Sequence, residues 1–219
     1  MIFTTILGAA LTLCSCGGGD DAQGADNSGQ GGGSITGNTE LSFTANTTDL
    51  LRNPMNGWVM YVSGSADPSY FDRQIYLSEL GKNVYVRDYA SACYIRTGWK
   101  SLNPADGKYA WDDPSTPIYK LVARAEELGL PIAFRVVVDG RDQRENTPQF
   151  VFDAGAEYWL ENDRYPDRKT PLAMDPIWRQ YYEKFVRAFA QRFNNAETTA
   201  FIDAYGLGKW GEGHNVCYE

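Results

Sequence analysis

The stretch STPIYKLVARAEELGLPIAFRVVVDG, residues 115–140, decides the fold class, because it reads as a helix followed at once by a strand. Thr116 is a suitable N-cap, Pro117 suits the first helical position and Gly129 suits the end of a helix. The run PIAFRVVV (131–138) then predicts a buried strand. Between the two caps, apolar residues recur at helical spacing, at Ile118, Leu121, Val122, Ala125 and Leu128.

Three further apolar runs predict strands on either side of this unit: GWVMYV (57–62), ACYIRTGW (92–99) and FIDAYGLG (201–208). The aromatic stripe of DPIWRQYYEKFVRAFAQRF (175–193) predicts a second helix packed on the core. This alternation predicts an α/β protein with a parallel sheet, either doubly wound or a (β/α) barrel. No Gly-rich dinucleotide fingerprint follows any strand, and the long connection over 139–175 favours the barrel.

The composition restricts the class of partner. The chain has 219 residues, a net charge of −8 and 14% aromatic residues. An acidic protein lacks the basic face that the phosphates of a nucleic acid require, so we expect no nucleic-acid partner. We also predict neither a cofactor nor a bound metal.

The N-terminal residues predict a targeting signal. The apolar run IFTTILGAALTL (2–13) is too short to span a bilayer, and LCSC (13–16) resembles the lipobox of bacterial lipoproteins. We therefore expect a signal peptide over 1–15, a lipidated Cys16 opening a flexible Gly-rich linker over 16–40, and a folded domain over 41–219. This implies an outer-membrane lipoprotein that faces the periplasm or the cell surface, held at the membrane by its lipid. Cys93 and Cys217 fall at opposite ends of predicted strands, so we expect no disulfide between them.

The segment YIRTGWKSLNPADGKYAWDD (94–113), with the helix and the strand that follow, resembles the N-terminal half of clan-A glycoside hydrolases such as the β-galactosidase-like barrels. NPMNGW (53–58), TPQFV (147–151) and YGLGKWGEGH (205–214) are similar to a set of glycosidase-like bacterial envelope proteins. The resemblance implies a (β/α)8 TIM barrel of which this chain holds the first four or so βα units. It also implies hydrolysis of O-glycosidic bonds in oligo- or polysaccharides.

The resemblance further assigns roles to particular residues. Glu212 would be the general acid/base after the fourth strand, although this chain has Gly211 where the family has asparagine. Apolar shielding by an indole would raise the pKa of such a carboxyl. Six further residues are candidates for substrate binding: Arg96, which in the family supports the nucleophile, Trp99 as a stacking platform, Asp139 and Arg141 of the third loop, and Trp210 and His214 beside Glu212. Within the third strand, we expect Arg135 to pair with an acid.

A retaining enzyme of this kind needs a second carboxylate, which the family takes from the seventh strand. The resemblance therefore implies a missing C-terminal half-barrel and an inactive chain as given. Two alternatives remain open: a carbohydrate-binding lipoprotein without catalysis, and a structural envelope protein with a glycosidase-like barrel. A complete four-stranded α/β sheet also remains open.

Overall fold

The computed structural model describes residues 57–139, 146–160, 168–204 and 206–219. All described residues belong to one compact unit, Asn46–Glu219. The predicted signal peptide, Cys16, the 16–40 linker and Arg141 lie outside the described residues.

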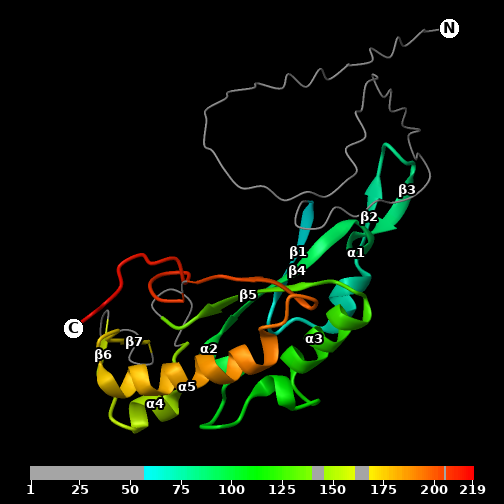
Figure 1. Ribbon diagram of the computed structural model, residues 1–219. Coiled ribbons are helices and arrows are strands. Elements are labelled where there is room, and N and C mark those ends of the chain that lie inside the picture. Colours follow the sequence, from blue (N-terminus) through cyan, green and yellow to red (C-terminus); the bar gives the residue numbers. More distant parts are fainter. Residues whose placement is uncertain (1–56, 140–145, 161–167, 205) are drawn as a thin grey trace, which may run out of the picture. The chain divides into compact units, whose positions relative to one another are not determined.

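A parallel sheet of four strands organises the fold (Figure 1). Its strands are β1 (Trp58–Ser63), β4 (Ala90–Gly98), β5 (Ile132–Val137) and β8 (Thr199–Ile202), and their order in the sheet follows their order in the chain. The predicted α/β class and all four predicted strands are therefore confirmed. The described residues form an open sheet and not a closed barrel.

Both predicted helices are present, and Thr116 caps the first of them as predicted. α3 (Pro117–Glu127) begins at Thr116, whose side chain accepts a hydrogen bond from the Tyr119 amide. α5 (Pro176–Phe193) begins at Asp175, whose side chain accepts one from the Trp178 amide. Each cap satisfies one of the backbone donors that the start of a helix leaves unpaired.

Smaller elements fill the connections. The first includes η1 (Pro68–Asp72), a hairpin of β2 (Gln74–Leu77) and β3 (Lys82–Tyr85), and α1 (Val86–Tyr89). α2 (Trp99–Leu102) and η2 (Ala110–Asp112) follow β4. The third connection includes α4 (Gln149–Asp153) and a hairpin of β6 (Tyr158–Leu160) and β7 (Lys169–Pro171).

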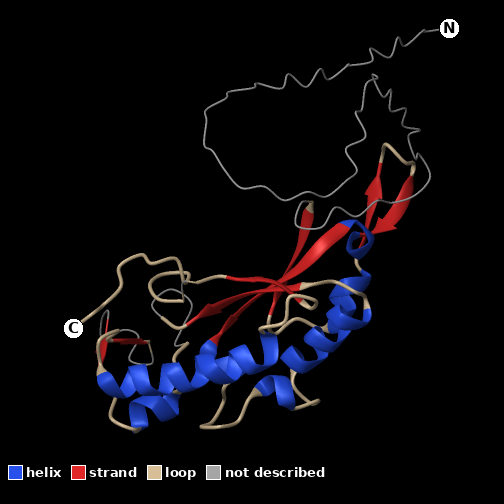
Figure 2. Cartoon of the chain, viewed as in Figure 1, coloured by secondary structure: helices blue, strands red, loops and turns tan. Residues whose placement is uncertain are grey.

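The core lies between one face of the sheet and the helices, which run along the same side of the sheet (Figure 2). Phe134 of β5 packs between two rings of α5, with ring centroids 5.1 Å from Phe189 and 4.6 Å from Phe193. The opposite face is open, since Tyr61 is 52% exposed and Phe201 is 42% exposed. Aromatic burial on one side therefore holds the strands in place, while the other side stays accessible.

The last strand is shorter than its predicted span of 201–208. The pairing of β5 with β8 shifts register between Ile132 and Ala133, and regular pairing ends at Ile202. Beyond that point the chain still follows β5, because the Asp203 amide donates to the Phe134 carbonyl at 2.9 Å and the Val138 amide donates to the Gly206 carbonyl at 2.8 Å. This irregular continuation carries the chain to the carboxyl edge of the sheet.

Candidate functional site

The turn after β8 is built by glycines in the left-handed region of backbone conformation. Gly208, Gly211 and Gly213 have φ values of 78°, 70° and 76°. At Gly208 a Cβ atom would lie 2.6 Å from the His214 backbone, so a side chain does not fit there. The Lys209 amide donates to the His214 carbonyl at 2.9 Å and closes the turn. Glycine adopts this left-handed backbone without steric cost, which suits all three positions of the turn.

Trp210 also has a left-handed backbone, with a φ of 58°. A tryptophan in this region is strained, and neighbouring contacts must hold it there. Arg96 of β4 supplies one such contact, because its Nη2 donates to the Trp210 carbonyl at 2.9 Å. The Trp210 indole is 43% exposed and meets the His214 ring edge to face, with centroids 5.7 Å apart. The strained turn therefore presents an indole at the surface.

Two basic side chains, Arg135 and His214, lie beside the Glu212 carboxylate. Arg135 Nη1 donates to Glu212 Oε1 at 2.6 Å. On the other side, His214 Nε2 lies 3.6 Å from Glu212 Oε2. The expectation that Arg135 pairs with an acid is confirmed, and one of its two acidic partners is the candidate acid/base.

Asp203 is the second partner of Arg135. It accepts hydrogen bonds on one oxygen, Oδ2, from Arg135 Nε and from the Tyr94 hydroxyl, both at 2.6 Å. Burial first, and then the hydrogen bond to Asp203, raises the pKa of Tyr94, so its hydroxyl stays a neutral donor. The hydrogen bond to Asp203 likewise contributes most to raising the pKa of Arg135, which therefore stays a cation. Asp203 and Tyr94 thus hold Arg135 in the orientation that reaches Glu212.

Strand register brings these groups to one edge of the sheet. Arg96 of β4 lies opposite Arg135 of β5, and Ser63 of β1 lies opposite Arg96. All three stand near the carboxyl ends of parallel strands, where α/β folds place their ligand sites. Sequence reasoning missed Asp203 and Tyr94, although an aspartate inside the apolar run FIDAY was a signal for the first of them.

Trp99, predicted as a stacking platform for a sugar, lies in the core. Its side chain is completely buried at the start of α2 and packs against α5, with centroids 5.4 Å from Tyr182 and 5.4 Å from Phe185. The indole Nε1 donates to Asn103 Oδ1 at 3.2 Å. The ring is core because the chain turns into α2 directly after Gly98, which directs Trp99 toward the helices.

Asp139, a predicted substrate-binding residue, is buried just after β5. It is only 1% exposed, and the Thr170 hydroxyl lies in hydrogen-bonding distance of its carboxylate at 3.3 Å. Its backbone carbonyl accepts a hydrogen bond from the Asn146 side chain at 3.0 Å. Asp139 therefore ties the third connection to β7.

Within the part of the chain that the structure describes, neither Cys93 nor Cys217 forms a disulfide. Cys93 is completely buried in β4, and this burial raises its pKa to about 12. Across the described ranges, no group of three or more His, Cys, Asp or Glu side chains is arranged to hold a metal ion. In that same part of the chain, no helix combines the length and apolarity needed to cross a bilayer.

The sequence matches no protein-family model, and it matches no curated protein. Among solved structures, the fold is similar to the crystal structure of xylanase B from Clostridium stercorarium F9, with a TM-score of 0.37 and 18% sequence identity. The match covers 66% of this chain and 37% of the xylanase chain. At this level the xylanase is a distant structural neighbour.

Proposed function

We propose that this chain carries the acid/base side of a carbohydrate-processing site, and that its sheet is the first part of a glycoside-hydrolase-like (β/α)8 barrel. The observation that carries the proposal is the network Tyr94–Asp203–Arg135–Glu212 at the carboxyl edge of the sheet. Barrel enzymes place their catalytic groups at this edge. The exposed rings of Tyr61 and Phe201 support the barrel, because a closed barrel fills that face with side chains.

The geometry around Glu212 gives each carboxylate oxygen a different neighbour. Oε1 accepts a hydrogen bond from Arg135, whereas Oε2 faces the imidazole of His214. A general acid/base gives a proton to the glycosidic oxygen and later takes one from water. We assign proton transfer to Oε2, because Arg135 occupies Oε1. The exposed indole of Trp210 would stack on a sugar ring beside it.

A second candidate function is carbohydrate binding without catalysis. The observation that favours it is the 2.6 Å contact between Arg135 and Glu212, since an arginine-bound carboxylate is a well-placed acceptor for a sugar hydroxyl. The two functions share a ligand class and differ in whether Glu212 exchanges a proton. Substitution of Glu212 separates them, as the Discussion describes.

Binding is tested through His214, which is the only histidine in the chain and gives one set of imidazole signals. In the full chain, we expect a panel of methyl glycosides to contain members that shift these signals in NMR titrations. Trp210→Ala should weaken binding about 2- to 10-fold through loss of stacking. Trp58→Ala is the control, because Trp58 is exposed at the other end of the sheet. If no member of the panel shifts the His214 signals, the carbohydrate site is refuted.

Membrane attachment through Cys16 is a separate part of the proposal, supported by the lipobox-like LCSC. We expect the protein to enter the detergent phase when expressed with its N-terminal residues, and Cys16→Ala to move it to the aqueous phase, because a buried acyl chain provides the membrane affinity. Cys14→Ala is the matched control and should behave as the wild type. Equal partitioning of wild type and Cys16→Ala would contradict lipidation.

A further inference from the structure

Arg96 differs from its neighbour Arg135 in having no acidic partner. Arg135 contacts the carboxylates of both Asp203 and Glu212. Arg96 instead donates from Nη2 to a backbone carbonyl, that of Trp210. Its Nε is buried and has no hydrogen-bond acceptor. Among the described residues, Arg96 is therefore a half-buried cation with unused donor capacity, and such a charge is costly unless an anion compensates it.

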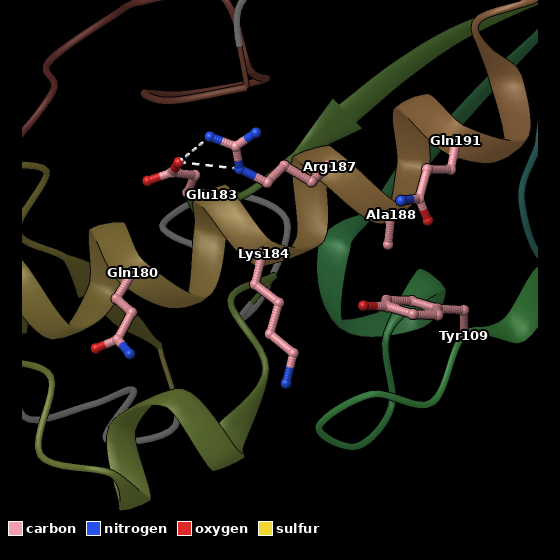
Figure 3. Close-up of a pocket in the computed structure, with 7 residues that line it drawn as sticks. All are labelled: Tyr109, Gln180, Glu183, Lys184, Arg187, Ala188 and Gln191. Carbon is pink, nitrogen blue, oxygen red and sulfur yellow. Dashed lines mark hydrogen bonds and ion pairs between the residues drawn. The ribbon is translucent and has the colours of Figure 1, made fainter.

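The cations on α5 show the contrasting arrangement. In the surface pocket drawn in Figure 3, Arg187 Nε donates to Glu183 at 3.0 Å on the same helix. Lys184, which lines that pocket, reaches Asp106 at 2.7 Å. These cations lie on the surface and pair with carboxylates, whereas Arg96 has a buried Nε without an acceptor among the described residues.

Two cavities, of about 220 Å³ and 400 Å³, are lined by Arg96 at the carboxyl ends of β1 and β4. Among the described residues, no aspartate or glutamate lines either cavity. Lys100 adds a second basic side chain to the larger cavity. The hydroxyls around the two cavities belong to Tyr61, Ser63, Ser65, Thr97, Ser101 and Thr116.

We propose that Arg96 binds an oxyanion of the ligand, and that the carbohydrate accepted here is an acidic one, a sugar with a carboxylate or a sulfate group. A planar guanidinium forms paired, charge-assisted hydrogen bonds with such groups, and hydroxyls complete the remaining acceptors. The anion would compensate the charge that the described residues leave without an acidic partner. That the ligand is a sugar rests on the proposed function. That it is acidic rests on Arg96 and on the two cavities that Arg96 lines.

The test compares three probes with the full chain by calorimetry and by NMR: methyl β-glucuronide, methyl β-glucoside and inorganic sulfate. The two glycosides differ only at C6, so their ratio of affinities reports the oxyanion without any mutation. We expect the glucuronide to bind about 10- to 100-fold more tightly, as for hydrogen bonds to charged groups. Added salt should reduce this ratio.

Arg96→Gln should bring the ratio close to one, and Arg96→Lys should retain part of it because the charge remains. Lys184→Gln is the control and should leave the ratio unchanged. Equal affinity for both glycosides in the wild type would overturn the acidic-ligand inference while leaving the carbohydrate proposal intact. Sulfate binding that depends on Arg96, without binding of either glycoside, would support the oxyanion site and refute the carbohydrate function. Binding of no probe would overturn both.

Discussion

In this chain complemented with a C-terminal half-barrel, replacing Glu212 by glutamine is expected to lower the turnover of a glycoside with a poor leaving group by about 10²–10⁴-fold, which is the usual contribution of general acid–base catalysis. The amide has the shape of the carboxyl group and cannot deliver a proton. Its carbonyl oxygen can still accept the hydrogen bond that Arg135 donates to Oε1. We therefore expect glycoside affinity and folding to be retained, so that the loss appears in kcat.

Two measurements connect this loss to proton transfer. A substrate with a very good leaving group needs little protonation, so its first step should be almost unaffected in Glu212→Gln. Azide should restore part of the turnover if the enzyme is retaining, because a small anion attacks the glycosyl intermediate without a general base. Glu183→Gln on α5 is the control, since Glu183 is exposed and pairs only with Arg187. A Glu212→Gln rate within a few-fold of the wild type would leave carbohydrate binding as the better function.

Replacing Trp99 by alanine is expected to lower the free energy of unfolding by about 3–5 kcal/mol, as measured for large aromatic truncations in cores. The indole is completely buried and contacts rings of α5, including Tyr182 and Phe185. Its removal leaves a cavity between the sheet and that helix, and also takes a donor from Asn103. Urea unfolding followed by circular dichroism measures the change.

Trp58→Ala is the matched control, because Trp58 is 70% exposed at the start of β1. We expect its effect to stay within about 0.5 kcal/mol, as is usual for surface substitutions. Trp99→Phe should fall between the two, since it keeps part of the ring packing. A loss below about 1 kcal/mol for Trp99→Ala would show that this ring does not support the core.

Local patterns predicted the regular part of the fold. The β-branched run around Val136 and the helical spacing of Leu121 and Val122 depend only on neighbouring residues. The hairpins β2–β3 and β6–β7 were not predicted, because their strands are short and lack strict alternation. The end of β8 was misplaced because its regular pairing with β5 stops at Ile202, and pairing between distant strands is not visible in the local sequence pattern.

The candidate site was predicted only in part for the same reason. Glu212, His214 and Trp210 are adjacent in sequence, so the turn was visible as a unit. The contacts of Arg135 with Asp203, 68 residues away, depend on which strands are neighbours. The local sequence pattern also does not predict which polar side chains are buried. Asp139 is buried, whereas some other polar residues at the carboxyl edge of the sheet are exposed.

The rate at which the Cys93 thiol is alkylated would report how often the central sheet opens. A thiol reagent must reach the sulfur atom and reacts with the thiolate form. Cys93 is completely buried in β4, so the reagent cannot reach it. Burial also raises the pKa of the Cys93 thiol to about 12, so little thiolate is present. Cys217 is half-buried near the C-terminal end and should react without separation of the strands. Alkylation of Cys93 would therefore proceed only when β4 leaves its neighbours. Mass spectrometry of the two labelled peptides over time would then separate surface reactivity from the rate at which the central sheet comes apart.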